Sequence, residues 1–260
     1  GDIEKAIEWM RKKGQASAAK KSGRIAAQGC IVADCSDGFA AMIEINCETD
    51  FVGKDENFKQ FCKGLMDYTK AHKTTEIAQL AEATLDNGQT VDAARLALVA
   101  KIGENIQLRR MACIESSHTL ASYTHGARIA VLVELEGGDE ALARDIAMHI
   151  AAINPECICA DEIQAEMLEK ERGIVTENAK QSGKPEAVIE KMVEGRMKKF
   201  VNEITLLGQA FVKDPSQSVA ALLKEHGASV KQFVRYELGE GIEKKEENFA
   251  DEVMKAVKGE

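Results

Sequence analysis

Apolar residues form two short runs in the first quarter of the chain. The runs cover residues 29–34 and 39–46, and the turn Ser36-Asp37-Gly38 separates them. An Asp-Gly pair between apolar runs is a strong signal for a β-hairpin. The pattern then changes to a helical period, whose apolar face holds Phe58, Phe61, Cys62, Leu65 and Met66. The sequence therefore predicts a hairpin that leads into an amphipathic helix.

The same order of elements occurs twice along the chain. Helical patterns at 76–85 and 90–100 and an alternating strand at 105–114 complete the first set. The second set has its turn at His125-Gly126, with strands expected at 120–124 and 128–135, helices at 139–153 and 219–226, and a strand at 230–238. This duplication of pattern predicts an α+β fold of two related subdomains. Each is expected to hold a three-stranded antiparallel sheet with helices on one face.

The stretch 155–214 interrupts the second set. It holds a polar helix over 163–181, the stop-start signal Ser182-Gly183-Lys184-Pro185 and a second helix, which together predict an αα-hairpin. The narrow apolar stripe of the second helix favours a coiled-coil contact with another chain, and the alternative is that the hairpin folds back on its own domain. The residues expected to form a dimer contact are Val188, Ile189, Met192, Met197 and Phe200.

Each end of the chain predicts a separate helical element. Residues 2–13 predict a short amphipathic helix, which resembles the last helix of a truncated N-terminal domain. Residues 244–257 predict a charged amphipathic helix with Phe249 and Val253 on its apolar face. The expected domains are a helix and linker at 1–23, core subdomains at 24–116 and 117–240 with the hairpin 155–214 inserted into the second, and a C-terminal helical module at 241–260.

One stretch differs from the rest of the pattern, namely Glu44-Ile45-Asn46-Cys47-Glu48-Thr49-Asp50-Phe51-Val52. Thr49 and Asp50 suit a helix start, because their side-chain oxygens accept hydrogen bonds from otherwise unpaired backbone N–H groups. Phe51 then has two interpretations. It is either a hydrophobic staple packed on the first turn of its own helix, or an exposed wedge that inserts into a partner.

Composition limits the class of protein. The chain has 260 residues, of which 45% are hydrophobic and 30% charged, as in a soluble globular protein of one or two domains. The net charge of −9 argues against a nucleic-acid-binding protein, which needs a basic face. No apolar run approaches the ~18 residues of a membrane-spanning helix. Seven scattered cysteines favour reduced thiols in the cytoplasm.

The residues offer no constellation that indicates an enzyme. No Gly-rich phosphate loop is present. Cys157 and Cys159 lack the partner ligands of a zinc site, so neither a metal nor a cofactor is expected. His149 has the spacing of a satisfied core histidine, whereas His125 is expected to be exposed at a hairpin tip. A binding protein is therefore favoured, and the alternative is a thiol-dependent hydrolase that uses Cys47.

Several motifs along the chain jointly resemble one known family. Besides the stretch 44–52, they are Ala100-Lys-Ile-Gly-Glu-Asn-Ile106 with Arg109-Arg110, His125-Gly-Ala-Arg-Ile129, Ile146-Ala-Met-His149, Gln181-Ser-Gly-Lys-Pro185, Val193-Glu-Gly-Arg-Met-Lys-Lys-Phe200 and Gly239-Glu-Gly-Ile-Glu243. In this order they resemble the bacterial elongation factor Ts family, over essentially the whole chain.

The resemblance implies a nucleotide-exchange factor for elongation factor Tu, the GTPase that carries aminoacyl-tRNA to the ribosome. It implies that Asp50 and Phe51 intrude into the GTPase, that His125 presses near its phosphate loop, and that the inserted hairpin mediates dimerisation. The partner-binding residues expected from it are Thr49, Asp50, Phe51, Val52, Ile102, His125, Gly126, Phe249 and Val253. Val52 is expected only to support Phe51.

Overall fold

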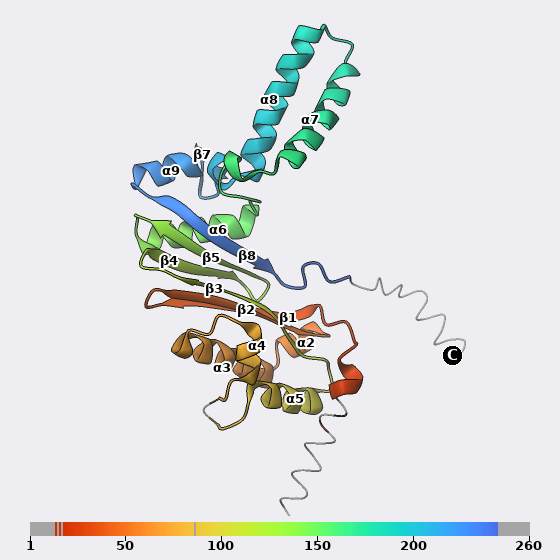
Figure 1. Cartoon of the computed structure of the whole chain (residues 1–260), viewed down its shortest axis with the longest axis vertical. Coiled ribbons are helices and arrows are strands. Elements are labelled where there is room, and N and C mark those ends of the chain that lie inside the picture. The colour runs from red at the N-terminus through yellow and green to blue at the C-terminus, as the bar shows by residue number, and fades with distance from the viewer. Residues whose placement is uncertain (1–13, 15, 17, 86, 244–260) are drawn as a thin grey trace, which may run out of the picture.

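Two three-stranded antiparallel sheets form the centre of the molecule (Figure 1). The computed structural model describes residues 14, 16, 18–85 and 87–243. The first sheet has the strand order β1-β2-β3 and the second has the order β4-β5-β8. The strands are β1 (Gln28–Ser36), β2 (Phe39–Cys47), β3 (Gln107–Glu115), β4 (Thr119–His125), β5 (Ile129–Glu136) and β8 (Ser229–Glu237). The predicted α+β class with two three-stranded sheets is confirmed.

Both predicted hairpins form at their turn residues. Asp37 and Gly38 make the two-residue connection between β1 and β2, with φ values of 50° and 73°. Positive φ at both positions suits the primed turn whose twist matches the strands. In the second hairpin, Gly126 has a φ of 59° and begins the short connection to β5.

The two sheets share an irregularity. The pairing register shifts between Glu44 and Ile45 in β2, and it shifts between Glu134 and Leu135 in β5. In each case the extra residue lies in the last strand of the sheet, Arg109 in β3 and Lys231 in β8. A bulge at corresponding places supports the duplication that the sequence pattern predicts.

The sheets pack face to face. Strand β2 is buried at all nine positions, because one face packs on helices and the other packs on the second sheet. The helices cover the outer faces of the two sheets, which gives the order helix, sheet, sheet, helix in Figure 1. The core between the sheets holds Ile31, Ala40, Met42, Ile114, Leu120, Ala130, Leu132 and Leu238.

Helix α3 (Glu56–His72) covers the first sheet and begins at the cap residue Asp55. The Asp55 carboxylate accepts hydrogen bonds from the backbone N–H groups of Asn57 and Phe58. Of the five apolar residues predicted on its inner face, Phe58, Cys62, Leu65 and Met66 are buried and Phe61 is half-buried. The other helices of the two subdomains are α2 (Asp50–Gly53), α4 (Ile77–Glu82), α5 (Val91–Ile102), α6 (Glu140–Ile153) and α9 (Val219–Glu225).

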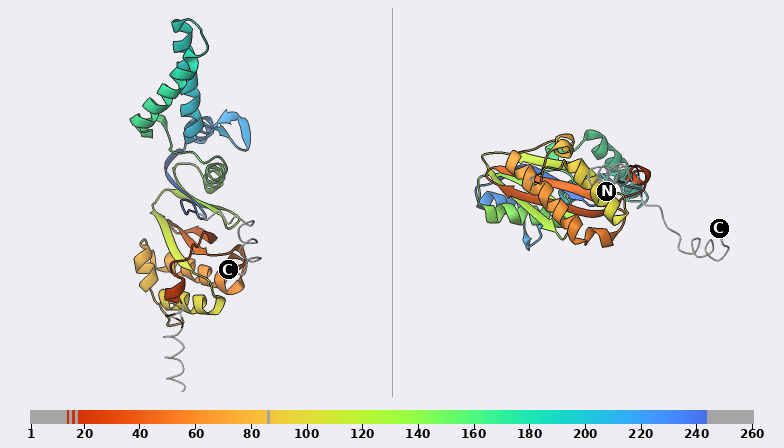
Figure 2. Two further views of the ribbon diagram at one scale, coloured as in Figure 1. Left: turned by 90° about the vertical axis from the view of Figure 1, so that its right-hand side faces the viewer. Right: turned by 90° about the horizontal axis from the view of Figure 1, so that it is seen from below.

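Helices α7 (Ala165–Lys180) and α8 (Glu186–Ile204) form the predicted αα-hairpin, which projects from the second subdomain (Figures 1 and 2). The two helices pack on each other through Val175, Ala179, Val193 and Met197. Ile189, Met192 and Phe200 lie against this cluster. Most of the stripe expected to contact another chain therefore packs inside the hairpin, whereas Val188 is 40% exposed.

Some elements were not predicted, and others lie outside the described residues. The short hairpin of β6 (Ala210–Phe211) and β7 (Asp214–Ser218) was missed, because β7 has no apolar residue. The helices predicted at 2–13 and 244–257 lie outside the described residues. Among the helices that the structure does describe, none has the length and apolar character needed to span a bilayer.

Candidate functional site

Phe51 is the most exposed of the large hydrophobic side chains that the structure describes, with 79% of its surface accessible. It lies in the one-turn helix α2, and its neighbour Val52 is buried in the core beneath the first sheet. A staple would cover the ring with its own helix. The staple interpretation is therefore wrong, and α2 presents Phe51 to solvent while Val52 anchors the turn.

The prediction that Thr49 caps this helix through its side chain is also wrong. Thr49 occupies the N-cap position, but its Oγ1 donates a hydrogen bond to Glu104 Oε1 at 2.6 Å and does not cap. Asp50 is exposed and pairs with Lys54 at 2.7 Å. This hydrogen bond from Lys54 lowers the pKa of Asp50, so a carboxylate stands beside the exposed ring.

Glu104 holds the backbone just before α2, whereas a side-chain cap would accept from N–H groups in the first turn of the helix. Its Oε2 accepts hydrogen bonds from the backbone N–H groups of Glu48 at 3.1 Å and Thr49 at 3.0 Å. In the other direction, Glu48 Oε1 accepts from the backbone N–H of Asn105 at 2.6 Å. We call Glu48, Thr49, Glu104 and Asn105 the Glu104 brace. Sequence reasoning missed it, because a search for caps considers only neighbouring residues.

The brace also links the end of α5, where Ile102 lies, to the turn that carries Phe51. Ile102 is the last residue of α5 and is half-buried against the first core. Gly103 ends the helix with a φ of 92°, and Glu104 follows at once. The exposed part of Ile102 therefore has a fixed relation to the turn that carries Phe51.

His125 lies at the end of β4 in the second subdomain, and its side chain is exposed as predicted. The turn after it contacts the first sheet, since the N–H of Ile31 donates to the carbonyl of Ala127 at 2.9 Å. Helix α2 approaches the same strand, because a Cβ atom on Gly53 would lie 3.0 Å from the carbonyl oxygen of Gly29. The structure thus brings the turn that carries Phe51 and the hairpin tip at His125 to the same end of β1.

The chain leaves the second subdomain beside the first sheet. The N–H of Gly239 donates to the fully buried carboxylate of Glu44 at 2.8 Å, and Glu240 pairs with Arg110 at 3.1 Å. The other two predicted contact residues, Phe249 and Val253, lie outside the described residues.

Comparison with known proteins identifies the family. The family model described as "Elongation factor TS" matches residues 48–240. An elongation factor Ts of Alkalilimnicola ehrlichii is 57% identical and is aligned over 100% of this chain and 89% of its own length. Those of Hydrogenovibrio crunogenus and Idiomarina loihiensis are each 53% identical over 99% of this chain and 88% of their own. The chain belongs to the elongation factor Ts family.

Members of this family are nucleotide-exchange factors for elongation factor Tu in translation elongation, and this chain is one of them. It is a binding protein and not an enzyme. The spans of the alignments give no support to the prediction that most of an N-terminal domain is missing.

The thiol chemistry agrees with that assignment. Cys47 is buried, and its Sγ donates a hydrogen bond to the carbonyl of Thr49 at 3.1 Å. Burial, together with the charge of Glu104, raises the pKa of Cys47 to about 12. A thiol attacks as its thiolate, so the hydrolase alternative has no support from this residue. The described residues also contain no group of three or more His, Cys, Asp or Glu side chains placed to hold a metal.

His149 is the satisfied core histidine that the sequence predicts. It is fully buried, and its Nε2 lies 2.9 Å from Oε1 of Gln209. Its Nδ1 accepts the backbone N–H of Val212 at 3.2 Å. Both ring nitrogens therefore have partners, and neither faces a solvent-filled site.

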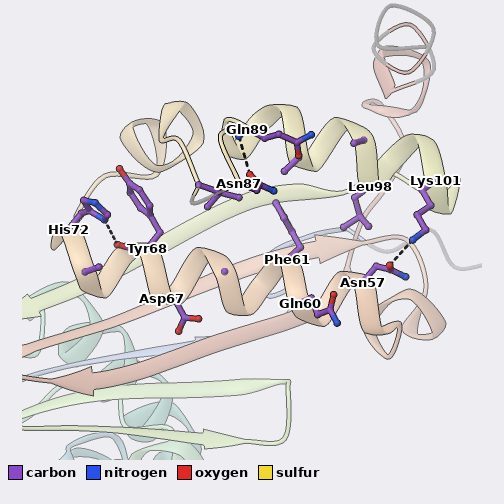
Figure 3. A pocket seen from close by; sticks show the side chains of 15 residues that line it. Asn57, Gln60, Phe61, Asp67, Tyr68, His72, Asn87, Gln89, Leu98 and Lys101 are labelled. Atoms are coloured by element: carbon purple, nitrogen blue, oxygen red, sulfur yellow. Dashed lines mark hydrogen bonds between the residues drawn. The ribbon is translucent and has the colours of Figure 1, made fainter. Parts of the chain in front are cut away.

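A groove of about 740 Å³ runs between α3 and α5 (Figure 3). Phe61 and Leu98 line it, Tyr68 stacks on His72 at one end, and Lys101 donates to Asn57 at 2.6 Å at the other end. The described lining residues include no Ser, Thr or Cys, so no nucleophile of those types faces the groove.

Proposed function

We propose that this chain releases GDP from elongation factor Tu by inserting the ring of Phe51 into an apolar gap of the GTPase, with Asp50 in contact beside it. The observation that carries the proposal is the 79% exposure of Phe51. Transfer of an exposed aromatic ring from water into an apolar gap of a partner lowers the free energy, because its apolar surface leaves water. Buried aromatic anchors are typical hot spots of an interface, each worth roughly 2 kcal/mol or more.

In the same proposal, His125 and Gly126 contact the GTPase near its phosphate loop, and Ile102 adds an apolar contact. The common location at one end of β1 supports this, because a single partner can contact both tips. A GTPase holds GDP through its phosphate loop and a Mg²⁺ ion. A factor that binds the nucleotide-free form more tightly displaces GDP, and GDP in turn displaces the factor.

Release of labelled GDP from elongation factor Tu tests the proposal. We expect Phe51→Ala to slow the accelerated release by about 30-fold, which corresponds to roughly 2 kcal/mol of lost contact. We expect His125→Ala to slow it as well. Ile153→Ala is the matched control, because Ile153 is also an exposed apolar residue, at 44%, but lies at the end of α6. Wild-type acceleration by both Phe51→Ala and His125→Ala would reject the proposal.

The remaining partner residues and the domain division rest on sequence. We include Phe249 and Val253 as partner contacts made by a C-terminal module at 241–260. We divide the rest of the chain into a segment at 1–23 and core subdomains at 24–116 and 117–240. One sheet in each core range supports this division. A cytoplasmic location is supported by the cysteines, all seven of which are free thiols.

We also propose self-association through the α7–α8 hairpin. Most of the apolar stripe of α8 packs against α7, but Val188 on α8 and Ile174 on α7 are 40% and 49% exposed. Exposed apolar side chains on a projecting hairpin are available to a second copy. Sedimentation at micromolar concentration tests this, with Val188→Glu expected to weaken association. A monomeric wild type, or an unchanged association in Val188→Glu, would contradict it.

A further inference from the structure

Helix α2 cannot hold its conformation unaided. It has four residues, and a single helical turn costs more conformational entropy than its hydrogen bonds return. Val52 is its only buried residue. Phe51, being 79% exposed, contributes almost no packing within the chain. The direction of Phe51 therefore depends on contacts made from outside the helix.

Glu104 makes those contacts with both carboxylate oxygens. Oε2 holds the N–H groups of Glu48 and Thr49, and Oε1 holds the Thr49 hydroxyl at 2.6 Å. Hydrogen bonds to an ionised carboxylate are about twice as strong as neutral ones. Three of them converge on Glu48 and Thr49, the two residues immediately before α2.

The second half of the brace fixes Glu104 in turn. Asn105 follows it in the chain, is 2% exposed, and donates its backbone N–H to Glu48. The side chain of Asn105 donates to the carbonyl of Arg24 at 2.8 Å. The two loops are thus bonded in both directions, and Asn105 connects them to the segment that precedes β1.

We propose that Glu104 is a positioning residue for nucleotide exchange. Its carboxylate holds the Glu48–Thr49 backbone so that Phe51 is directed at the GTPase before contact. This inference rests on the proposed role of Phe51, and Glu104 acts through that residue without touching the partner. An ordered binding element loses less conformational entropy when it binds. Because Glu104 follows Ile102 and Gly103 directly, it also fixes the spacing between two partner contacts.

GDP release measured over a range of factor concentrations tests the inference with the full chain. We expect Glu104→Ala to lower the apparent kcat/KM for exchange about tenfold, as for a loss of preorganisation. Glu104→Gln should stay within about threefold, since its amide oxygen can still accept both N–H groups and its NH₂ can donate to Thr49. Glu115→Ala is the control, because Glu115 is an exposed carboxylate at the far end of β3.

A double variant distinguishes positioning from a general loss of stability. If Glu104 acts through Phe51, then Phe51→Ala/Glu104→Ala exchanges no more slowly than Phe51→Ala alone. Amide hydrogen exchange provides a readout without the partner. The N–H groups of Glu48 and Thr49 should lose protection in Glu104→Ala while the thermal midpoint stays near wild type. If that variant does not fold, Thr49→Val, which removes only the hydroxyl bond, should give a smaller loss of the same kind.

The results separate two failures. Normal exchange by Phe51→Ala would reject the proposed function itself. Slow exchange by Phe51→Ala with normal exchange by Glu104→Ala would reject only the role of Glu104. Multiplying effects in the double variant, or a Glu104→Gln variant as slow as Glu104→Ala, would also overturn it.

Discussion

The Nε atom of Arg110 lies 2.6 Å from Oε2 of Glu44, whose side chain is completely buried. The bulge in β3 gives this carboxylate a second arginine. Glu44 pairs with Arg110 and Ile45 pairs with Leu108, so Arg109 is the extra residue. Its Nη1 reaches Glu44 Oε1 at 2.9 Å. With the N–H of Gly239 on the same oxygen, Glu44 links the first sheet to the chain that leaves the second.

Replacement of Glu44 should therefore destabilise the fold. We expect Glu44→Ala to lower the free energy of unfolding by about 3–5 kcal/mol, because it leaves two arginines without their buried counterion. Urea unfolding followed by circular dichroism measures this. Glu115→Ala is the matched control, since its pair with Lys73 is exposed and such pairs contribute about 1 kcal/mol or less. Equal unfolding midpoints for the two variants would contradict the role of Glu44.

His149 should make stability depend on pH. Nδ1 accepts the N–H of Val212, so protonation of Nδ1 would break this hydrogen bond and leave two N–H donors facing each other. Burial lowers the pKa of His149 below its usual 6.5. The unfolded chain therefore binds this proton first as the pH falls, and the stability present above about pH 6.5 is lost below it.

The expected slope is up to about 1.4 kcal/mol per pH unit below pH 6.5. Urea unfolding of the wild type at pH 7.5 and 5.5 measures it. His149→Gln has no titrating ring and should lose this part of the slope. The same pH dependence in both proteins would show that His149 is not responsible.

Much of the fold could be predicted because its signals are local. The Asp37-Gly38 turn and the apolar face of α3 require only neighbouring residues to interpret. The packing of the two sheets on each other was not predicted. A signal for it exists in β2, where residues 39–43 are apolar without interruption, as expected of a strand covered on both faces.

The candidate site was predictable in position but not in geometry. Phe51 stood out as an aromatic residue among charges, yet a staple and a wedge have the same local sequence. The three-dimensional packing decides between them, because Val52 is buried while Phe51 is exposed, and Glu104, 55 residues from Thr49, holds the backbone before the helix. Contacts over such a separation depend on the register of the whole sheet, which no local pattern contains.

Two glycines should respond to alanine in opposite directions. Gly29 has a φ of 127°, and a Cβ atom there would lie 2.1 Å from the carbonyl oxygen of Ile45. Gly29→Ala should destabilise the protein by more than ~1 kcal/mol. Gly64 lies within α3, and its Cβ would meet nothing within 4 Å. Gly64→Ala should stabilise by about 0.5–1 kcal/mol. Thermal unfolding midpoints that shift in the same direction would contradict this account.

Cys47 should be unreactive in the folded protein although it lies next to the proposed wedge. Burial raises its pKa to about 12, and its thiol hydrogen is directed to the carbonyl of Thr49. At pH 8 the thiolate fraction is then on the order of 10³-fold below that of a free cysteine, and alkylation should slow accordingly. Peptide mass spectrometry after timed treatment with iodoacetamide measures the rate at each cysteine.

The same alkylated protein separates a binding factor from a thiol enzyme. A factor that acts through Phe51 needs no thiolate, so GDP release should keep its wild-type rate while Cys47 stays unlabelled. Cys47→Ser, which cannot be alkylated, is the control for effects of reagent on other cysteines. A reactive thiol would give the opposite result. Cys47 would be labelled rapidly in the folded chain, and the reagent would slow GDP release by the wild type but not by Cys47→Ser.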